Sequence, residues 1–260
     1  MAREQREVFD EVAGAYDRAR PEYPSALVDD ILDFARLAPG DRILEIGPGT
    51  GKATVAFAAR GFPMLCVEPG AKLAEVLRAN VDGLGPEAGE VEIALSRFED
   101  QPLTRGGFGL AIAAQSFHWV DPELGFAHCA EAVRAGGALA LFGNMPRRGE
   151  SELHRAVEAC YMEHAHALRP DALRSYRERD YAAELATAGQ FGTAFEARYP
   201  FHRDYGADLY IELLSTQSDH RMIEPAVREA LLASIHTAIV EHGGTLRVDY
   251  ETYLLLVRRR

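Results

Sequence analysis

The chain has 260 residues, of which 47% are hydrophobic, and its 28 basic and 40 acidic side chains give a formal charge of -12 at pH 7. This length and hydrophobic fraction suit a globular α/β protein with a full core, either as one domain or as a core domain with a smaller lid. The negative charge repels polyanions, so we expect no nucleic acid among its partners.

Neither an export signal nor a metal site is expected from the sequence. The first residues, MAREQREVFDEVAGAYD, are charged throughout, and no stretch approaches the roughly 18 apolar residues of a membrane helix. The three cysteines are far apart and form no CxxC pair, so neither a disulfide framework nor a zinc site is indicated. We therefore expect a cytoplasmic protein without a membrane partner, either a monomer or a homodimer.

Helices and strands alternate in the first part of the chain. Apolar residues at helical spacing predict helices, and short apolar runs bounded by glycine or proline predict buried parallel strands. In chain order we predict a helix over 3–19, a helix from Ser25, a strand from Arg42, a helix over 53–60, a strand over 64–68, a helix over 71–80, strands over 91–96 and 110–114, a helix from Asp121 to about Ala135, and a strand over 138–142.

The pattern changes after residue 142. We predict helices over 150–168, 176–188, 207–217 and 225–242, a strand over 195–203, and a final strand within 246–259. Alternating strands and helices with short loops imply a parallel sheet covered on both faces. The predicted fold class is therefore α/β, a Rossmann-like doubly wound sheet that is mostly parallel, with an antiparallel closing strand pair and a helical lid insertion.

The stretch RILEIGPGTGKAT, residues 42–54, places a strand, a glycine-rich turn and a helix in succession. This arrangement brings backbone N–H groups close to a small ligand. A P-loop is disfavoured because Ile46 stands at its first glycine position, and Ala53, at its Ser/Thr position, cannot ligate magnesium. A dinucleotide fingerprint fits imperfectly because Gly51, the third glycine, comes one position early.

An acidic residue at the end of the next strand narrows the class of ligand. Glu68 lies 19 residues after Gly49, where a carboxylate can hold the hydroxyls of a ribose. This layout suits any adenosine ligand, so by itself it leaves NAD open.

The motif EIGPGTG resembles the first motif of class I S-adenosylmethionine-dependent methyltransferases, in which the loop backs the methionine part of the cofactor and the later acid binds the ribose. SRFED, AAQSFHWVDP and AGGALAL resemble that family's third-, fourth- and fifth-strand motifs, and YDRARPEYP resembles the entry segment of its small-molecule members. The nearest subgroup is the type 11 or trans-aconitate methyltransferase-like group. The resemblance implies S-adenosyl-L-methionine as cofactor, S-adenosyl-L-homocysteine as product and a small-molecule methyl acceptor.

The resemblance also assigns roles to individual residues. It implies cofactor contacts from Tyr16, Arg20, Tyr23, Glu45, Gly47, Pro48, Gly49, Gly51, Glu68, Pro69, Phe98, Glu99, Gln115, Ser116 and Phe117. Candidates on the acceptor side are His118, Trp119 and Gln217, with His118 also a candidate catalytic residue and no metal expected. Whether His118 acts as a base depends on the acceptor, because a carboxylate is already ionised while a hydroxyl or an amine is not.

The implied domains and function follow from these assignments. We predict a cofactor-covering helical segment at 1–36, a cofactor-binding core at 37–145, a helical insertion at 146–190, and closing strands with a substrate-side helical insertion at 191–260. The predicted reaction is in-line SN2 methyl transfer to a carboxylate or hydroxyl, with N- or C-methylation also open. The alternatives are an NAD-dependent oxidoreductase and a non-catalytic domain that binds S-adenosylmethionine.

Overall fold

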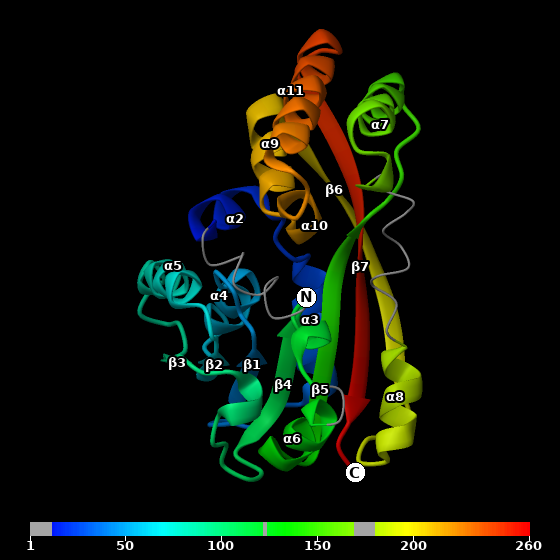
Figure 1. The fold of residues 1–260 in the computed structure, drawn as a ribbon. Helices are drawn as coiled ribbons and strands as arrows, with labels where there is room; N and C mark the ends of the chain where they lie inside the picture. The colour runs from blue at the N-terminus through cyan, green and yellow to red at the C-terminus, as the bar shows by residue number, and fades with distance from the viewer. Residues whose placement is uncertain (1–11, 122–123, 169–179) are drawn as a thin grey trace. The chain divides into compact units, whose positions relative to one another are not determined.

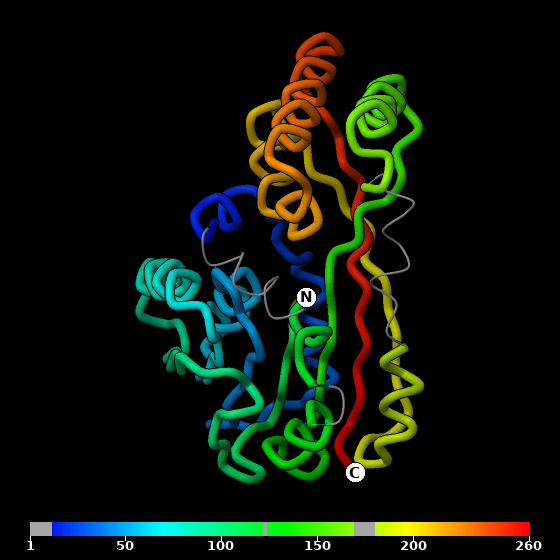
Figure 2. Tube along the Cα trace, in the orientation of Figure 1, coloured from blue at the N-terminus to red at the C-terminus, as the bar shows by residue number. Residues whose placement is uncertain are grey.

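The computed structural model describes residues 12–121, 124–168 and 180–260 (Figure 1). These residues belong to two compact units. The core unit comprises the described residues within Glu22–Asn144, Arg179–Tyr199 and Thr252–Arg260, and the helical unit comprises those within Met1–Pro21, Met145–Glu178 and Pro200–Glu251. Both units are therefore built from segments far apart in the sequence, and the chain trace follows these segments in turn (Figure 2).

A seven-stranded sheet has the order β3-β2-β1-β4-β5-β7-β6. Its strands are β1 Arg42–Ile46, β2 Met64–Val67, β3 Val91–Ala94, β4 Phe108–Ala114, β5 Val133–Pro146, β6 Phe195–Gly206 and β7 Thr245–Arg258. Strands β1 to β5 pair in parallel. At the end of β7, Arg259 donates its N–H to the carbonyl of Gly137 and accepts from the N–H of Gly136, which is an antiparallel exchange with β5. The predicted mostly parallel sheet with an antiparallel closing pair is confirmed.

Helices cover both faces of the sheet in the core unit. Side chains of β1 alternate between the faces, so Ile43 and Leu44 belong to different hydrophobic clusters. The cluster with Ile43 includes residues of α3 (Ser25–Ala35), α4 (Lys52–Ala58) and α5 (Ala71–Asp82). The cluster with Leu44 includes residues of α6 (Gly125–Ala132), α8 (Tyr181–Ala188) and the short 3-10 helices η1 (Phe98–Asp100) and η2 (Phe117–Trp119).

The helical unit has a hydrophobic cluster of its own. Its helices are α2 (Ala13–Ala19), α7 (Glu152–His164), η3 (His166–Leu168), α9 (Ala207–Ser215), α10 (Ser218–Arg221) and α11 (Pro225–Glu241). Tyr161, Tyr205 and Tyr250 are among the buried residues of this cluster. Among the described residues, no helix combines the length and apolar character that a bilayer-crossing segment requires.

Several predicted element boundaries are wrong. The strand predicted over 138–142 spans Val133–Pro146, and the helix predicted over 150–168 ends at His164. The helix predicted to reach about Ala135 ends at Ala132, because Val133 is fully buried and pairs with Phe108 at the start of β5. Pairing with a neighbouring strand thus outweighs the local helical pattern. The helix predicted over 207–217 ends at Ser215, and Gln217 precedes the separate short helix α10. Predictions for residues 3–11, 122–123 and 176–179 lie outside the described residues.

Candidate active site

Strand β1 lies between β2 and β4, so the strand order reverses at this position. In open parallel sheets, ligands bind beyond the carboxyl ends of the strands at such a reversal. The glycine-rich turn follows β1, Glu68 follows β2, and Gln115 and Ser116 follow β4. The fold therefore brings these predicted cofactor residues to one edge of the sheet in the core unit.

The glycines of the turn adopt backbone angles that side-chain-bearing residues rarely take. Gly47, Gly49 and Gly51 have φ of 62°, 61° and 90°. A Cβ atom on Gly47 would lie 2.7 Å from Cβ of Ser116, and one on Gly51 would lie 2.3 Å from Cδ1 of Leu77. A Cβ on Gly49 would meet no described heavy atom within 4 Å. Gly47 and Gly51 are thus required by packing, whereas the space beside Gly49 is open.

Glu68 connects the turn to the next helix through both of its carboxylate oxygens. Its Oε2 accepts from the N–H of Gly49 and its Oε1 accepts from the N–H of Gly70, each at 2.9 Å. The side chain is nearly buried, and Gly70 is the N-cap of α5. This carboxylate is consequently fixed beside the glycine turn. Of the two prolines predicted here, Pro48 is buried and Pro69 is exposed.

Glu45 is fully buried in the middle of the sheet, and its two carboxyl oxygens have different surroundings. The Thr54 hydroxyl donates to Oε2 at 2.6 Å, and the Cys66 sulfur lies 3.7 Å from the same oxygen. Oε1 has no hydrogen-bond partner among the described residues. Burial raises the pKa of Glu45 to about 7; the bonds from Thr54 and Cys66 oppose this shift, and the negative charge of Glu68 adds to it.

The end of β4 is held to its neighbours by side-chain contacts. Gln115 has a φ of 57°, uncommon for a residue other than glycine, and its Nε2 donates to the carbonyl of Asn144 at 2.9 Å. The Ser116 hydroxyl donates to the carbonyl of Ile46 at the end of β1. Asn144 in turn accepts a hydrogen bond from Thr252 at 2.6 Å. Backbone strain of this kind is concentrated at functional sites, which supports a role for the β4 end.

The predicted aromatic cofactor contacts are buried in the core. Phe98 and Phe117 are both almost inaccessible, and the Phe117 ring centroid lies 4.9 Å from that of Phe126. Next to Phe98, Oε1 of Glu99 accepts from the backbone N–H of Asp121 at 3.1 Å. Cofactor contacts from these three residues stay predictions.

The candidate acceptor-side residues of the core unit lie next to the β4 end. His118 is exposed and Trp119 is half-buried, and their ring centroids are 4.6 Å apart within η2. Tyr23, a predicted cofactor contact, is half-buried, and its ring lies edge-to-face with Phe142 at a centroid distance of 4.9 Å. In the described part of the chain, no cluster of histidine, cysteine, aspartate and glutamate side chains could hold a metal ion.

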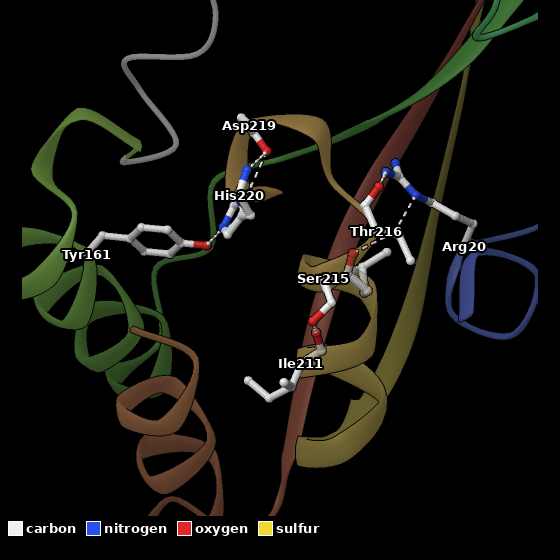
Figure 3. A network of polar contacts seen from close by, with 8 residues as sticks. Arg20, Tyr161, Ile211, Ser215, Thr216, Asp219 and His220 are labelled. Carbon is white, nitrogen blue, oxygen red and sulfur yellow. Dashed lines mark hydrogen bonds and ion pairs between the residues drawn. The ribbon is translucent and has the colours of Figure 1, made fainter. Parts of the chain in front are cut away.

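Three predicted site residues belong to the helical unit instead. Arg20 donates from Nε to the Thr216 hydroxyl and from Nη2 to the Thr216 carbonyl, both at 3.1 Å (Figure 3). Its guanidinium carbon lies 5.0 Å from the ring centroid of Tyr16. Gln217 follows Thr216 directly and is the N-cap of α10. The binding roles of Tyr16, Arg20 and Gln217 also stay predictions.

A buried polar network in the helical unit was not predicted. The Nε2 of His220 lies 2.8 Å from the Tyr161 hydroxyl, and its Nδ1 lies 2.8 Å from Oδ1 of Asp219 (Figure 3). A carboxylate only accepts, so Nδ1 of His220 donates to Asp219. Burial raises the pKa of Tyr161, which keeps its hydroxyl protonated. Only the polar character of the segment SDHR indicated this network.

Replacing Tyr161 by phenylalanine is expected to lower the free energy of unfolding by about 1–3 kcal/mol, because Nε2 of the buried His220 loses its hydrogen-bond partner. Urea unfolding of Tyr161→Phe checks this expectation. Tyr199→Phe is the matched control, since its hydroxyl bonds to Asp30 at an exposed position. Equal effects of the two substitutions would contradict the expectation.

Comparison with known proteins agrees with this geometry. Residues 44–141 match the family described as "Methyltransferase domain". An uncharacterized methyltransferase of Mycobacterium tuberculosis is 34% identical over 136 residues, which are 52% of this chain and 51% of that protein. An uncharacterized methyltransferase of Geobacillus is 26% identical over 211 residues, covering 77% of this chain and 96% of that protein. The chain thus spans about half the length of the mycobacterial relative.

Solved structures share the fold. A proposed methyltransferase from an antibiotic biosynthesis pathway of Anabaena variabilis superposes with a TM-score of 0.61 at 19% identity, covering 91% of this chain and 98% of the other. Phosphoethanolamine N-methyltransferase 2 of Haemonchus contortus, in complex with S-adenosylhomocysteine, gives a TM-score of 0.55 at 13% identity. The superposition covers 96% of this chain and 57% of the other. The family match over residues 44–141 and the shared fold make the glycine-turn segment similar to methyltransferase domains.

Proposed function

We propose that this chain transfers the methyl group of S-adenosylmethionine to a small-molecule acceptor. The observation that carries the proposal is the Glu68 carboxylate, fixed by the N–H groups of Gly49 and Gly70 beside a turn with open space at Gly49. The buried oxygens Oε1 of Glu45 and Oγ1 of Thr50 have no hydrogen-bond partner among the described residues. Unpartnered buried polar atoms at a turn of this kind are expected where a polar ligand binds.

Roles for the site residues follow from their positions. The turn Gly47–Gly51, including Pro48, would hold the amino acid end of the cofactor, and Glu68 with the adjacent Pro69 would hold the ribose hydroxyls. Glu99, with Phe98 next to it, would contact the adenine. The segment Gln115–Phe117 would form the rim, because it follows β4 at the same edge of the sheet.

When bound, S-adenosylmethionine supplies a methyl group on a positively charged sulfur. The protein then needs to align the acceptor and exclude water. A carboxylate or hydroxyl acceptor is our preferred class, with N- or C-methylation as the alternative. His118 is exposed at the end of the site segment and is the proposed base for a hydroxyl acceptor. We propose that residues 146–190 and 207–242 select the acceptor, and that the acidic chain has no nucleic acid partner.

The proposal is tested by incubating the full chain with methyl-tritiated S-adenosylmethionine and separate sets of carboxylates, phenols and amines. Transfer of label to one set is expected, with none for Gly49→Arg. Saturable binding of S-adenosylhomocysteine without transfer to any set would favour a non-catalytic binding domain. Saturable binding of NADH, with none of S-adenosylhomocysteine, would favour an oxidoreductase.

A further inference from the structure

We propose that Glu45 carries a proton while the glycine turn is empty and releases it when a ligand with a positively charged amino acid end binds. Cofactor binding would then be linked to proton release. This inference rests on the proposed function, because it takes the turn to be the site of the methionine end. It concerns a carboxyl group that lies inside the sheet, two residues before the turn begins.

The location of Glu45 makes a permanent negative charge costly. Its backbone lies opposite Cys66 of β2 and Ile112 of β4, and its side chain is fully buried. A buried carboxylate is stable only when it is paired or receives several hydrogen bonds. Glu45 receives one strong bond, from the Thr54 hydroxyl at 2.6 Å. The Cys66 sulfur at 3.7 Å is a weaker donor.

Among the described residues, the groups that shift the pKa of this carboxyl include no positive charge. From α4 it faces the uncharged Thr54, and from β4 its register partner is the apolar Ile112. From β2 it faces Cys66, and burial raises the pKa of this thiol well above its ordinary value, so that it stays neutral. Beyond the end of β2, Glu68 adds a second negative charge. These surroundings favour the neutral form of Glu45.

Glu45 and Glu68 are therefore two carboxyl groups with opposite environments at one turn. Glu68 accepts two backbone hydrogen bonds, whereas Oε1 of Glu45 has no partner among the described residues. The arriving amino acid end carries an ammonium group. An opposite charge within about 4–6 Å favours ionisation of a carboxyl, and an ammonium placed at Oε1 would also supply the missing donor. The ligand charge then takes the place of the proton.

The sign of the pH dependence follows directly. Burial holds the pKa of Glu45 at about 7 without ligand, and a bound cation lowers this pKa. Binding therefore releases a proton. Affinity for S-adenosylhomocysteine should therefore rise with pH, by up to about tenfold per unit below pH 7, and level off above it. At pH 7 about half a proton should be released for each ligand bound.

The test is calorimetric titration of the full chain with S-adenosylhomocysteine at pH 7, in buffers of different ionisation enthalpy. Titration with 5′-methylthioadenosine gives the comparison, because this ligand keeps the adenosine and the sulfur but lacks the amino acid end. Proton release is expected with the first ligand and not with the second. Glu45→Gln should bind S-adenosylhomocysteine without proton release, whereas Glu92→Gln, which changes an exposed acid of β3, should behave as wild type.

The outcomes distinguish a failure of the proton linkage from a failure of the proposed function. Saturable binding with the same heat in every buffer would overturn the proton linkage and leave the cofactor assignment standing. Equal proton release with both ligands would overturn the role of the amino acid end. No saturable binding would overturn the proposed function itself. If Glu45→Gln does not fold, the infrared C=O band of a protonated carboxylic acid in the wild-type chain should still disappear on binding, and its persistence would overturn the linkage.

Discussion

Replacement of Gly49 by arginine is expected to abolish binding of S-adenosylhomocysteine while leaving the core unit folded. The new side chain would occupy the open space beside the turn, where a Cβ meets no described atom within 4 Å. Because the φ of Gly49 is 61°, the substitution also carries backbone strain of about 1–2 kcal/mol. Calorimetric titration measures the loss of binding, and urea unfolding measures the strain.

Gly40→Arg is the matched control for this substitution. Gly40 has a φ of 88° and the same open surroundings for a Cβ, but it lies in the turn before β1 rather than after it. The control should lose a similar amount of stability and keep its affinity for the ligand. Equal loss of binding in Gly40→Arg and Gly49→Arg would show that strain, rather than occupation of the site, causes the effect.

Replacement of Glu68 by glutamine is expected to weaken binding of S-adenosylhomocysteine by at least about 100-fold. Hydrogen bonds to a charged group contribute about 1.5–3 kcal/mol each, and two ribose hydroxyls would lose such a partner. The glutamine amide would also place an NH2 group against one of the N–H donors of Gly49 and Gly70. Both effects act at the same turn, so we expect this loss of affinity to exceed the loss caused by replacing an exposed acid.

Glu75→Gln provides the comparison, because Glu75 is an exposed acid on the helix that begins after Glu68. Its affinity should stay within about twofold of wild type, since surface substitutions change free energies by about 0.5 kcal/mol or less. Unchanged binding by Glu68→Gln would remove the ribose assignment and leave the carboxylate with a purely structural role between Gly49 and Gly70.

Local features of the sequence predicted the positions of the strand, the glycine turn and Glu68 in the fold. The strand, the turn and the helix around Gly47–Gly51 are predicted by a short apolar run, three glycines and a helical pattern, respectively. These three signals are adjacent in the sequence and form one supersecondary unit. The position of Glu68 follows from the rule that parallel strands end at the same edge of a sheet. For this reason the glycine turn and Glu68 could be placed at the same edge of the sheet from the sequence alone.

Features that depend on distant residues could not be predicted in the same way. The boundary at Ala132 is set by the pairing of Val133 with Phe108, which no local pattern reveals. In the helical unit, Arg20 bonds to Thr216 from 196 positions away. Hydrophobic periodicity specifies which face of an element is buried but carries no information on which partner covers it.

The hydrogen-bond partners of the polar side chain inside the sheet could not be predicted from the sequence either. Glu45 is expected to contact the cofactor because of the family motif, and the structure adds hydrogen bonds to Glu45 from Thr54 and Cys66. Thr54 lies in the first turn of α4 and Cys66 on the next strand, so their meeting depends on how the helix lies over the sheet. The environment that distinguishes Glu45 from Glu68 therefore emerges only from the assembled core unit.

Calorimetric titration of the wild-type chain with S-adenosylhomocysteine tests the central claim most directly. A class I methyltransferase site at the glycine turn predicts saturable binding at one site per chain, with no binding by Gly49→Arg. The absence of saturable binding by a folded wild-type chain would contradict the assignment of the turn and Glu68 to this cofactor.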